Sequence, residues 1–299
     1  MITVFGSINL DLIGRVGRIP KPGETVPGSS FATAPGGKGA NQALAARRSG
    51  ARVRMVGAAG KDAMGDQALA LLAEGGVDLG AVKRLDLPQG VAMIFVDDSG
   101  ENVIGILPGA NAAVSAADAD SALGDLASGD VLVVQQEVAQ DATLAAVDLA
   151  RRRGARSILN TAPFLPSTAE AAKHADIVVA NETEFALLAG DGDLKVLMRQ
   201  WAKASGRTII VTLGPDGARA AMPDAWLSVP ALRITPVDTV GAGDTFVGYL
   251  AAGLDAGLSL EAAMARGAVA ASLACLKPGA QPSIPMAAEV DAALERDAF

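Results

Sequence analysis

One short segment, residues 236–246, combines an acid in a loop, two glycines and a second acid at the start of a helix. Asp238 comes first, Gly241 and Gly243 flank Ala242, and Asp244 precedes an alanine-rich apolar stretch, 246–254, that predicts a helix. The first N–H groups of a helix lack partners within it, and the helix dipole adds positive potential, so small residues there let an anion approach the backbone. Asp244 could then take a proton from a hydroxyl that faces the anion. A basic carboxylate beside an anion site is what phosphoryl transfer to an alcohol requires.

The same residues have a simpler interpretation. Asp244 is a favourable acid in the first turn of any helix, and the two glycines would equally serve a tight turn. The choice between the two interpretations depends on where the other polar residues of the chain lie.

Asn9 and Asp11 follow an apolar run at residues 2–6 that predicts a buried strand. If the chain is still extended there, the two side chains point the same way, because side chains in a strand alternate between its faces. Such a pair suits the vicinal hydroxyls of a sugar. A turn rich in Asn and Asp after the strand is the alternative.

More polar residues stand at the carboxyl ends of later predicted strands, where ligands of open parallel sheets bind. They are Gln135, Glu137, Asn160, Asn181, Glu184, Thr212 and Gly214. Asn181 and Glu184 are three residues apart at a helix start and therefore share a face, and a carboxylate there could hold Mg²⁺ through water. Each residue alone has a capping or turn explanation, but their joint placement at one edge favours a functional site.

A second glycine-rich helix start lies at residues 35–42. It is not a Walker A loop, because the glycine five positions before Lys38 is missing and Gly39 stands where Ser or Thr should follow. Nor does a dinucleotide-binding Gly-x-Gly-x-x-Gly pattern open there.

The elements that must position these residues alternate regularly between strand and helix. Predicted strands lie at 2–6, 53–58, 131–135, 157–160, 177–180, 208–212, 218–222 and 226–229. Predicted helices lie at 40–49, 64–74, 115–127, 141–153, 168–174, 183–189, 194–205, 246–254 and 286–296, with an apolar helical run at 267–276. This alternation predicts an α/β fold with a mostly parallel sheet covered on both faces. Extended pieces within 12–33 and at 91–97 and 102–107, around a turn at 98–101, predict a small antiparallel sheet apart from it.

Composition narrows the class of protein. The chain has 299 residues, 50% of them hydrophobic, and a net charge of −8, which argues against a nucleic-acid or membrane binder. The chain has one cysteine, Cys275, and one histidine, His174. It therefore has too few of these residues to favour thiol catalysis, zinc catalysis or a triad that contains histidine. We expect Cys275 to be a small core residue and His174 to end a helix. No secretory signal is apparent and no apolar run is long enough to span a bilayer, so we expect a cytoplasmic protein.

With these motifs together, the chain resembles the ribokinase-like, or PfkB, carbohydrate kinases over nearly its whole length. The resemblance rests on residues 6–11, 22–25, 36–42, 100–102, 109–111, 181–184, 238–246 and 279–283. It implies one domain, residues 1–299, with a three-layer, doubly wound sheet and a sugar-covering β lid at about 12–34 and 91–107. It also implies ATP-dependent phosphorylation of D-ribose at the 5-hydroxyl.

The resemblance assigns roles residue by residue. Asp244 would be the base, and the N–H groups from Gly241 through Ala242 and Gly243 to Asp244 would hold the transferred charge. The sugar would contact Asn9, Asp11, Gly37, Lys38, Asn41, Glu137 and Asp244. The nucleotide would lie against Asn181, Thr212, Gly214, Gly217 and Gly243, and Glu184 would serve Mg²⁺ through water. An activating K⁺ would lie among Asp238, Val240, Ala274, Lys277, Gly279 and Ser283, and the lids of two subunits would pair in a homodimer.

Some positions depart from the family pattern. Leu107 and Pro108 stand near the lid where small or polar residues are frequent, which puts the exact sugar in question. Another pentose, a ketose or a nucleoside is therefore an alternative acceptor, although aromatic residues for base stacking are only 3% of the chain. A non-catalytic sugar-binding regulator is the alternative from a different class, and the intact Asp244 and Glu184 argue against it.

Overall fold

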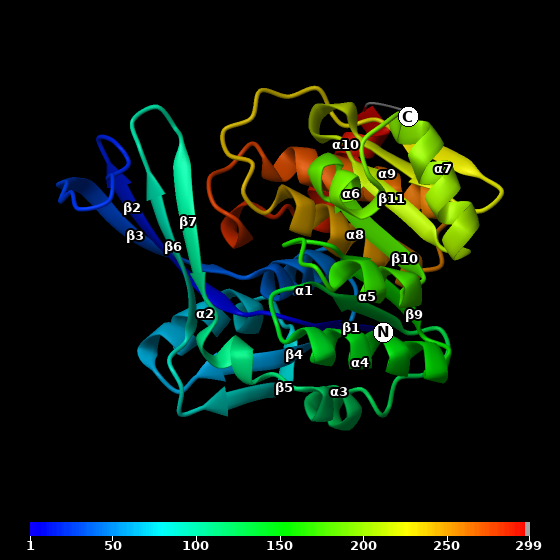
Figure 1. Ribbon diagram of the computed structural model, residues 1–299, viewed down its shortest axis with the longest axis horizontal. Helices are drawn as coiled ribbons and strands as arrows, with labels where there is room; N and C mark the ends of the chain where they lie inside the picture. Colours follow the sequence, from blue (N-terminus) through cyan, green and yellow to red (C-terminus); the bar gives the residue numbers. More distant parts are fainter. Residues whose placement is uncertain (297–299) are drawn as a thin grey trace.

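The computed structural model describes residues 1–296 and has a nine-stranded sheet at its centre (Figure 1). The strand order is β13-β12-β11-β10-β9-β8-β1-β4-β5. Strands β4, β5 and β8–β11 run parallel to β1 in the sheet, and β12 and β13 add antiparallel strands at one edge. The predicted mostly parallel α/β sheet is confirmed. Within residues 1–296, no helix combines the length and apolar character that crossing a membrane requires.

The strands of the large sheet are β1 Ile2–Phe5, β4 Val53–Gly60, β5 Asp78–Leu85, β8 Val131–Val134, β9 Arg156–Asn160, β10 Ile177–Asn181, β11 Thr208–Thr212, β12 Ala218–Ala221 and β13 Trp226–Val229. The helices are α1 Lys38–Arg48, α2 Ala63–Glu74, α3 Ala116–Ala122, α4 Gln140–Arg153, α5 Thr168–His174, α6 Glu182–Ala189, α7 Leu194–Ser205, α8 Ala242–Asp255, α9 Leu260–Ala274 and α10 Ala287–Arg296. Short 3₁₀ turns occupy Gly109–Ala113, Gly214–Asp216 and Gln281–Ser283.

Two hydrophobic cores lie on opposite faces of this sheet. In β8, Val131 and Val133 face the core formed with α1, α2, α8, α9 and α10, whereas Leu132 and Val134 face the core formed with α3 to α7. Alternation along a strand whose residues are all buried is expected when helices cover both faces. The three layers therefore follow directly from short, continuously apolar strands.

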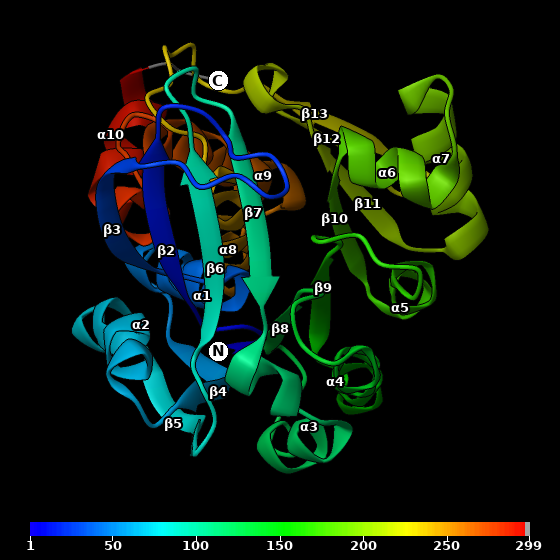
Figure 2. The ribbon, with the colours of Figure 1, turned by 60° about the vertical axis from the view of Figure 1, so that its left-hand side comes forward.

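A second sheet stands apart from the large one (Figure 2). It contains β2 Asn9–Val16, β3 Gly28–Gly36, β6 Gly90–Val96 and β7 Asn102–Leu107, in the order β3-β2-β6-β7. Both hairpins are antiparallel, as predicted, and their inner strands β2 and β6 pair in parallel. Because β2 follows β1 after three residues, this sheet is attached at the carboxyl edge of the large one.

Three expectations from the sequence were wrong in detail. Strand β5 was missed because its half-exposed residues at the sheet edge form no apolar run. Helix α3 ends at Ala122 instead of residue 127, since Leu123 and Gly124 begin a series of turns. Cys275 is partly exposed instead of buried in the core. His174 ends α5 as expected and contacts Asp148.

Candidate active site

Helix α8 begins within the segment 236–246, which contains the two glycines and the two acids. Gly241 precedes the helix with φ of 75°, and the first intrahelical bond joins the Thr245 N–H to the Gly241 carbonyl at 2.8 Å. The amides of Gly243 and Asp244 therefore precede the helical bonding pattern, as the start of a helix requires. A Cβ placed on Gly243 would meet no heavy atom within 4 Å, and Gly243 lines a cavity, so the start of the helix is open on this side. This arrangement can accept an anion.

Asp244 is buried, with 7% of its surface exposed, and both of its carboxylate oxygens are hydrogen-bonded. The Asn41 amide donates to Oδ2 and the Gln42 amide to Oδ1, each at 2.9 Å. Both donors lie in the first turns of α1, which starts at the second glycine-rich segment. The two glycine-rich helix starts therefore meet at one carboxylate.

The start of α1 packs against the strand that carries the predicted sugar-binding pair. Gly37 has φ of 89°, and a Cβ there would lie 2.6 Å from the Asn9 backbone nitrogen, so only glycine fits. Glu137 accepts hydrogen bonds from Ser7 Oγ at 2.5 Å and from the Lys38 N–H at 3.1 Å.

Asn9 and Asp11 both belong to β2 and lie on one face of the small sheet, as their spacing predicted. Asn111 donates to Asn9 Oδ1 at 2.7 Å and accepts from the Ile8 N–H at 2.9 Å, which fixes the Asn9 side chain.

Charges in this region are strongly coupled. Burial, and then the carboxylates of Glu137 and Asp244, raise the pKa of Asp11 to about 7, against the opposing effect of Lys38. Burial opposes the charge of Lys38, but the carboxylates around it, first Asp244 and then Glu137 and Glu184, raise its pKa above the ordinary value. A cation surrounded by acids in this way keeps its charge and can attract a phosphate.

A polar cavity of about 230 Å³ adjoins Asp244. Its lining includes Lys38, Asn160, Asn181, Glu184, Thr212, Gly241, Gly243 and Asp244. Asn181 and Glu184 form a capping box at the start of α6, with the Asn181 side chain bonded to the Glu184 N–H and the reverse. Glu184 also accepts from Thr161 Oγ at 2.8 Å. The Asn181–Glu184 pair therefore caps the start of α6, as residues three apart can, and it also lines the polar cavity.

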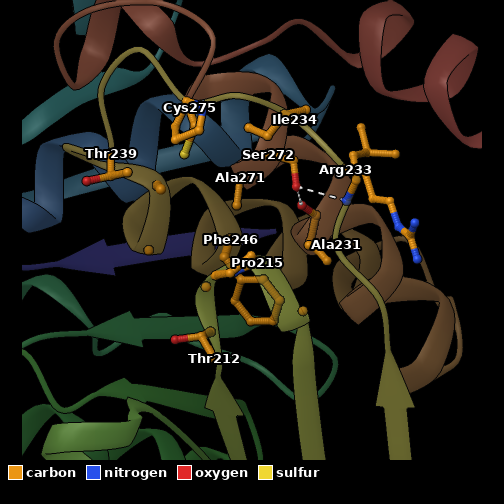
Figure 3. Close-up of a pocket in the computed structure, with 17 residues that line it drawn as sticks. Thr212, Pro215, Ala231, Arg233, Ile234, Thr239, Phe246, Ala271, Ser272 and Cys275 are labelled. Carbon is orange, nitrogen blue, oxygen red and sulfur yellow. Dashed lines mark hydrogen bonds between the residues drawn. The ribbon is translucent and has the colours of Figure 1, made fainter.

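A larger apolar cavity of about 500 Å³ adjoins the polar one, since Thr212, Thr239 and Gly243 line both cavities. Figure 3 shows the residues that line the larger cavity. Thr212, Gly214 and Gly217 line it from the end of β11, and residues from 231–236, α8 and α9 line it elsewhere. The Ser272 hydroxyl already makes two hydrogen bonds within the protein, because it donates to the Ala268 carbonyl and accepts from the Leu232 N–H (Figure 3). Cys275 also lines this cavity, which is why it is partly exposed. The cavity suits a flat heteroaromatic group, and its border with the polar cavity at Gly243 suits a phosphate chain.

The segments with the predicted K⁺ ligands also meet. Asp238 accepts from the Val240 N–H at 3.0 Å with one oxygen and from the Gly279 N–H at 2.8 Å with the other. Ser283 donates to the Ala280 carbonyl, and the Ala274 carbonyl accepts from the Lys277 N–H. The Lys277 ammonium is paired with Glu289. A Cβ on Gly241 would lie 2.9 Å from the Ala280 Cβ, so this loop also supports the start of α8.

The structure thus brings the predicted sugar-binding residues and the two cavities together around Asp244, and the segments with the predicted K⁺ ligands meet beside Gly241 at the start of α8. Reasoning from the sequence did not single out Ser7, Gln42 or Asn111 as site residues. Each of the three lies in a segment rich in glycine and polar residues, which is a sequence pattern that could have indicated a site. Their hydrogen-bond partners, however, are 32 to 202 positions away and could not be identified from the sequence. Asn41 differs from expectation in one respect, because its amide donor is already bound to Asp244.

Comparisons with known proteins find similarity over nearly the whole chain. The pfkB family carbohydrate kinase model matches residues 1–287. The ribokinase of Lactococcus lactis is 35% identical over 295 residues, which are 98% of this chain and 97% of the relative. A deoxyribokinase of Salmonella typhi is also 35% identical, over 95% of each chain. The solved structure of Arabidopsis thaliana ribokinase complexed with ribose and ATP superposes with a TM-score of 0.88 at 28% identity, covering 98% of both chains.

Proposed function

The chain belongs to the pfkB family of carbohydrate kinases, and we propose that it transfers the γ-phosphoryl group of ATP to the 5-hydroxyl of D-ribose, giving ribose 5-phosphate and ADP. The observation that carries this proposal is the position of Asp244. Its buried carboxylate lines the polar cavity, which meets the apolar cavity at Gly243, and it lies close enough to Asp11 to help raise the pKa of that carboxyl group.

We assign Asp244 as the base that takes the proton of the 5-hydroxyl as its oxygen attacks the phosphoryl group. The amides at the start of α8 stabilise the negative charge on the transferred group, as fixed dipoles do in a site that excludes water. Phosphoryl transfer depends mainly on positioning and charge stabilisation, so one carboxylate, an anion site and a metal are sufficient.

Asn9, Asp11, Gly37, Lys38, Asn41 and Glu137 are the proposed sugar-binding residues. The lid strands would cover the sugar, because Asp11 lies in a cross-strand row with Ala34, Ala92 and Ile106 on one face of the small sheet. That apolar surface would exclude water from the reaction.

The nucleotide would place its base in the apolar cavity against Thr212, Gly214 and Gly217 and its phosphates near Asn181 and Gly243. Mg²⁺ would bind these phosphates and contact Glu184 through water. The donor set fits, because Asn181 and the carboxylate-bearing Glu184 line the polar cavity beside Gly243, and Mg²⁺ beside phosphates needs few protein carboxylates. The metal would neutralise charge on the phosphates.

An ADP-release assay with Mg-ATP and K⁺ tests this function. The acceptors are D-ribose, 2-deoxyribose, fructose, adenosine and uridine. Preferred turnover of D-ribose supports the proposal, whereas preferred turnover of 2-deoxyribose would instead match the equally similar deoxyribokinase. Sugar binding without turnover of any acceptor would indicate the regulatory alternative.

The raised pKa of Asp11 makes a prediction about stability. Its pKa of about 7 in the folded protein exceeds the ordinary pKa of an aspartate, about 3.9, so the folded state holds the proton more tightly and this group's contribution to stability is lost as the pH rises toward 7. Between pH 5.5 and pH 8 the ligand-free protein should lose about 2 kcal/mol of unfolding free energy from Asp11. Asp11→Asn should abolish that loss while weakening sugar binding. Urea unfolding of the two proteins at both pH values measures the difference.

Asp98→Asn is the matched control, since Asp98 lies in the exposed turn of the same sheet. It should leave both the pH dependence and the sugar affinity at wild-type values. Equal pH dependence of wild type and Asp11→Asn would contradict the assignment of a buried, charge-coupled Asp11.

We also propose K⁺ activation through Asp238, Val240, Ala274, Lys277, Gly279 and Ser283. Carboxylate, hydroxyl and backbone carbonyl oxygens are hard donors that suit this cation. Because the loop at 279–283 supports Gly241, a bound cation would hold the anion site in place. Turnover should be several-fold faster in K⁺ than in Na⁺ at equal ionic strength, and Asp238→Ala should lose that preference. Equal rates in the two salts would remove the cation site from the proposal.

A homodimer through the lid is the final part of the proposal. The face of the small sheet opposite Asp11 carries exposed apolar side chains, namely Phe31, Met93, Phe95, Val103 and Leu107. A contiguous apolar surface beside the open edge of β7 is typical of an interface. Sedimentation of the wild type should give a dimer, and Phe95→Lys should shift it toward monomer. A monomeric wild type at micromolar concentration would refute it.

A further inference from the structure

The carboxylate of Asp244 is held by amide side chains instead of cations. Gln42 Nε2 donates to Oδ1 and Asn41 Nδ2 to Oδ2, so each oxygen receives one bond from α1. Two amide donors on different oxygens define the plane of the carboxylate as well as its position. A base that must face one hydroxyl needs this control of orientation.

Chemistry dictates how these amides are turned. An ionised carboxylate only accepts hydrogen bonds, so Gln42 must present its NH₂ group to Asp244. The Gln42 oxygen is then directed at Gln135, which must present its own NH₂ group, and the distance between Gln135 Nε2 and Gln42 Oε1 is 2.7 Å. The order Gln135, Gln42, Asp244 therefore has one direction, from donor to acceptor.

Gln42 is also fixed from a third element. Its Nε2 donates to Asn160 Oδ1 at 3.1 Å, and Asn160 Nδ2 donates in turn to the Val179 carbonyl at 3.2 Å. Gln42 and Gln135 are fully buried. Gln42 thus has fixed hydrogen-bond partners at the ends of β8 and β9. Its own hydrogen bond to Asp244 then fixes that carboxylate at the start of α8.

The space for this arrangement depends on Gly6. A Cβ on Gly6 would lie 2.9 Å from Gln135 Cδ, so a larger residue at the end of β1 would displace Gln135. Residues at the ends of β1, β8 and β9 therefore all help to fix the position of the Gln42 amide. We call Gln135 and Gln42 the amide relay.

We propose that Gln42 is a positioning residue for Asp244, with Gln135 behind it, and that the amide relay sets the orientation of the base independently of sugar binding. This inference rests on the proposed function, in which Asp244 takes the proton of the acceptor hydroxyl. It goes further by assigning a role in turnover to two fully buried amides that are not among the proposed sugar- or nucleotide-binding residues.

The relay predicts a split between turnover and binding. Gln42→Met keeps the length of the side chain and removes its hydrogen bonds, so kcat should fall by about 10- to 100-fold while KM for D-ribose changes by less than about threefold. Gln135→Met should lower kcat by about 3- to 10-fold, because it acts only through Gln42. The double variant should be no slower than Gln42→Met alone, since the relay is already broken.

Ser157→Ala is the matched control. Ser157 is fully buried at the opposite end of β9, where it donates to Asp176 at 2.9 Å. It should lower the thermal midpoint, as we also expect of the relay variants because they too lose buried hydrogen bonds, and leave kcat at the wild-type value. A kcat for Gln42→Met within about twofold of wild type, or fully multiplicative effects in the double variant, would overturn the relay.

A crystal structure of each variant gives a result that does not depend on turnover. In Gln42→Met the Asp244 carboxylate should rotate or occupy more than one orientation, and Gln135→Met gives the same test if Gln42→Met does not fold. A wild-type orientation of Asp244 in these variants would refute the relay even if no sugar were phosphorylated. Absence of kinase activity in the wild type, with Asp244 rotated in the variants, would refute the proposed function alone.

Discussion

Replacing Asp244 by asparagine should reduce turnover by about 10³-fold or more while sugar binding survives, because the variant loses the group that takes the hydroxyl proton. The geometry adds a second reason. Both oxygens of Asp244 accept from amides of α1, so the NH₂ group of an asparagine would face the NH₂ group of Asn41 or Gln42. Either the new side chain or the Asn41 amide, whose buried oxygen has no partner, must then turn, or one donor is left without a partner. Single-turnover ADP release and calorimetry with D-ribose measure the two effects.

Asp255→Asn serves as the control for this prediction. Asp255 ends the same helix and accepts from the N-terminal ammonium at 2.7 Å, far from the cavities. It should lose a little stability and no turnover. Wild-type turnover in Asp244→Asn would show that another group is the base.

Gly243→Ala should leave the fold intact and lower kcat/KM for ATP by about 10²-fold, because a fixed donor site loses its contact with the transferred group. A Cβ at this position meets no heavy atom within 4 Å, so the protein has room for it. That room lies between the two cavities, where the phosphate chain is proposed to pass. Since alanine favours helix over glycine, the unfolding free energy should stay equal or rise by about 0.5–1 kcal/mol.

Gly253→Ala in the same helix should have the opposite effect. Its Cβ would lie 2.8 Å from the Cβ of Ala263 on α9, so the unfolding free energy should fall without a specific loss of ATP affinity. Measuring unfolding and ATP kinetics for both variants separates loss of fold from obstruction of the anion site. Wild-type ATP kinetics in Gly243→Ala would mean that the phosphate takes another path.

Several features could be predicted from sequence because they depend on neighbouring residues. Short apolar runs such as 131–134 form strands buried on both faces, and the small residues before Asp244 leave the start of α8 open to an anion. The hairpin at 98–101 follows from turn residues between two extended segments, and the spacing of Asn9 and Asp11 places them on one face of β2. Each of these features depends on only a few neighbouring residues, because the steric limits of the backbone and the alternation of side chains along a strand act over that short distance.

Other features were decided by partners far away in the chain. Strand β5 exists because β4 provides an edge for it, although its own residues are half exposed. Cys275 is accessible because a cavity opens between α8, α9 and residues 231–236. The raised pKa of Asp11 depends on burial and on Glu137 and Asp244, which are distant in sequence.

The sequence by itself determined the α/β architecture, the two glycine-rich helix starts and the acid that follows the second of them. Only the tertiary structure decided that these two helix starts meet at one carboxylate. Gln42 and Asp244 are 202 positions apart, and they touch because α1 and α8 pack closely together on one face of the large sheet, where a Cβ on Gly248 would lie 2.6 Å from the Gln42 carbonyl oxygen. A local pattern can show that a side chain is suited to accept a hydrogen bond, but the partner that donates it depends on which distant helices pack together.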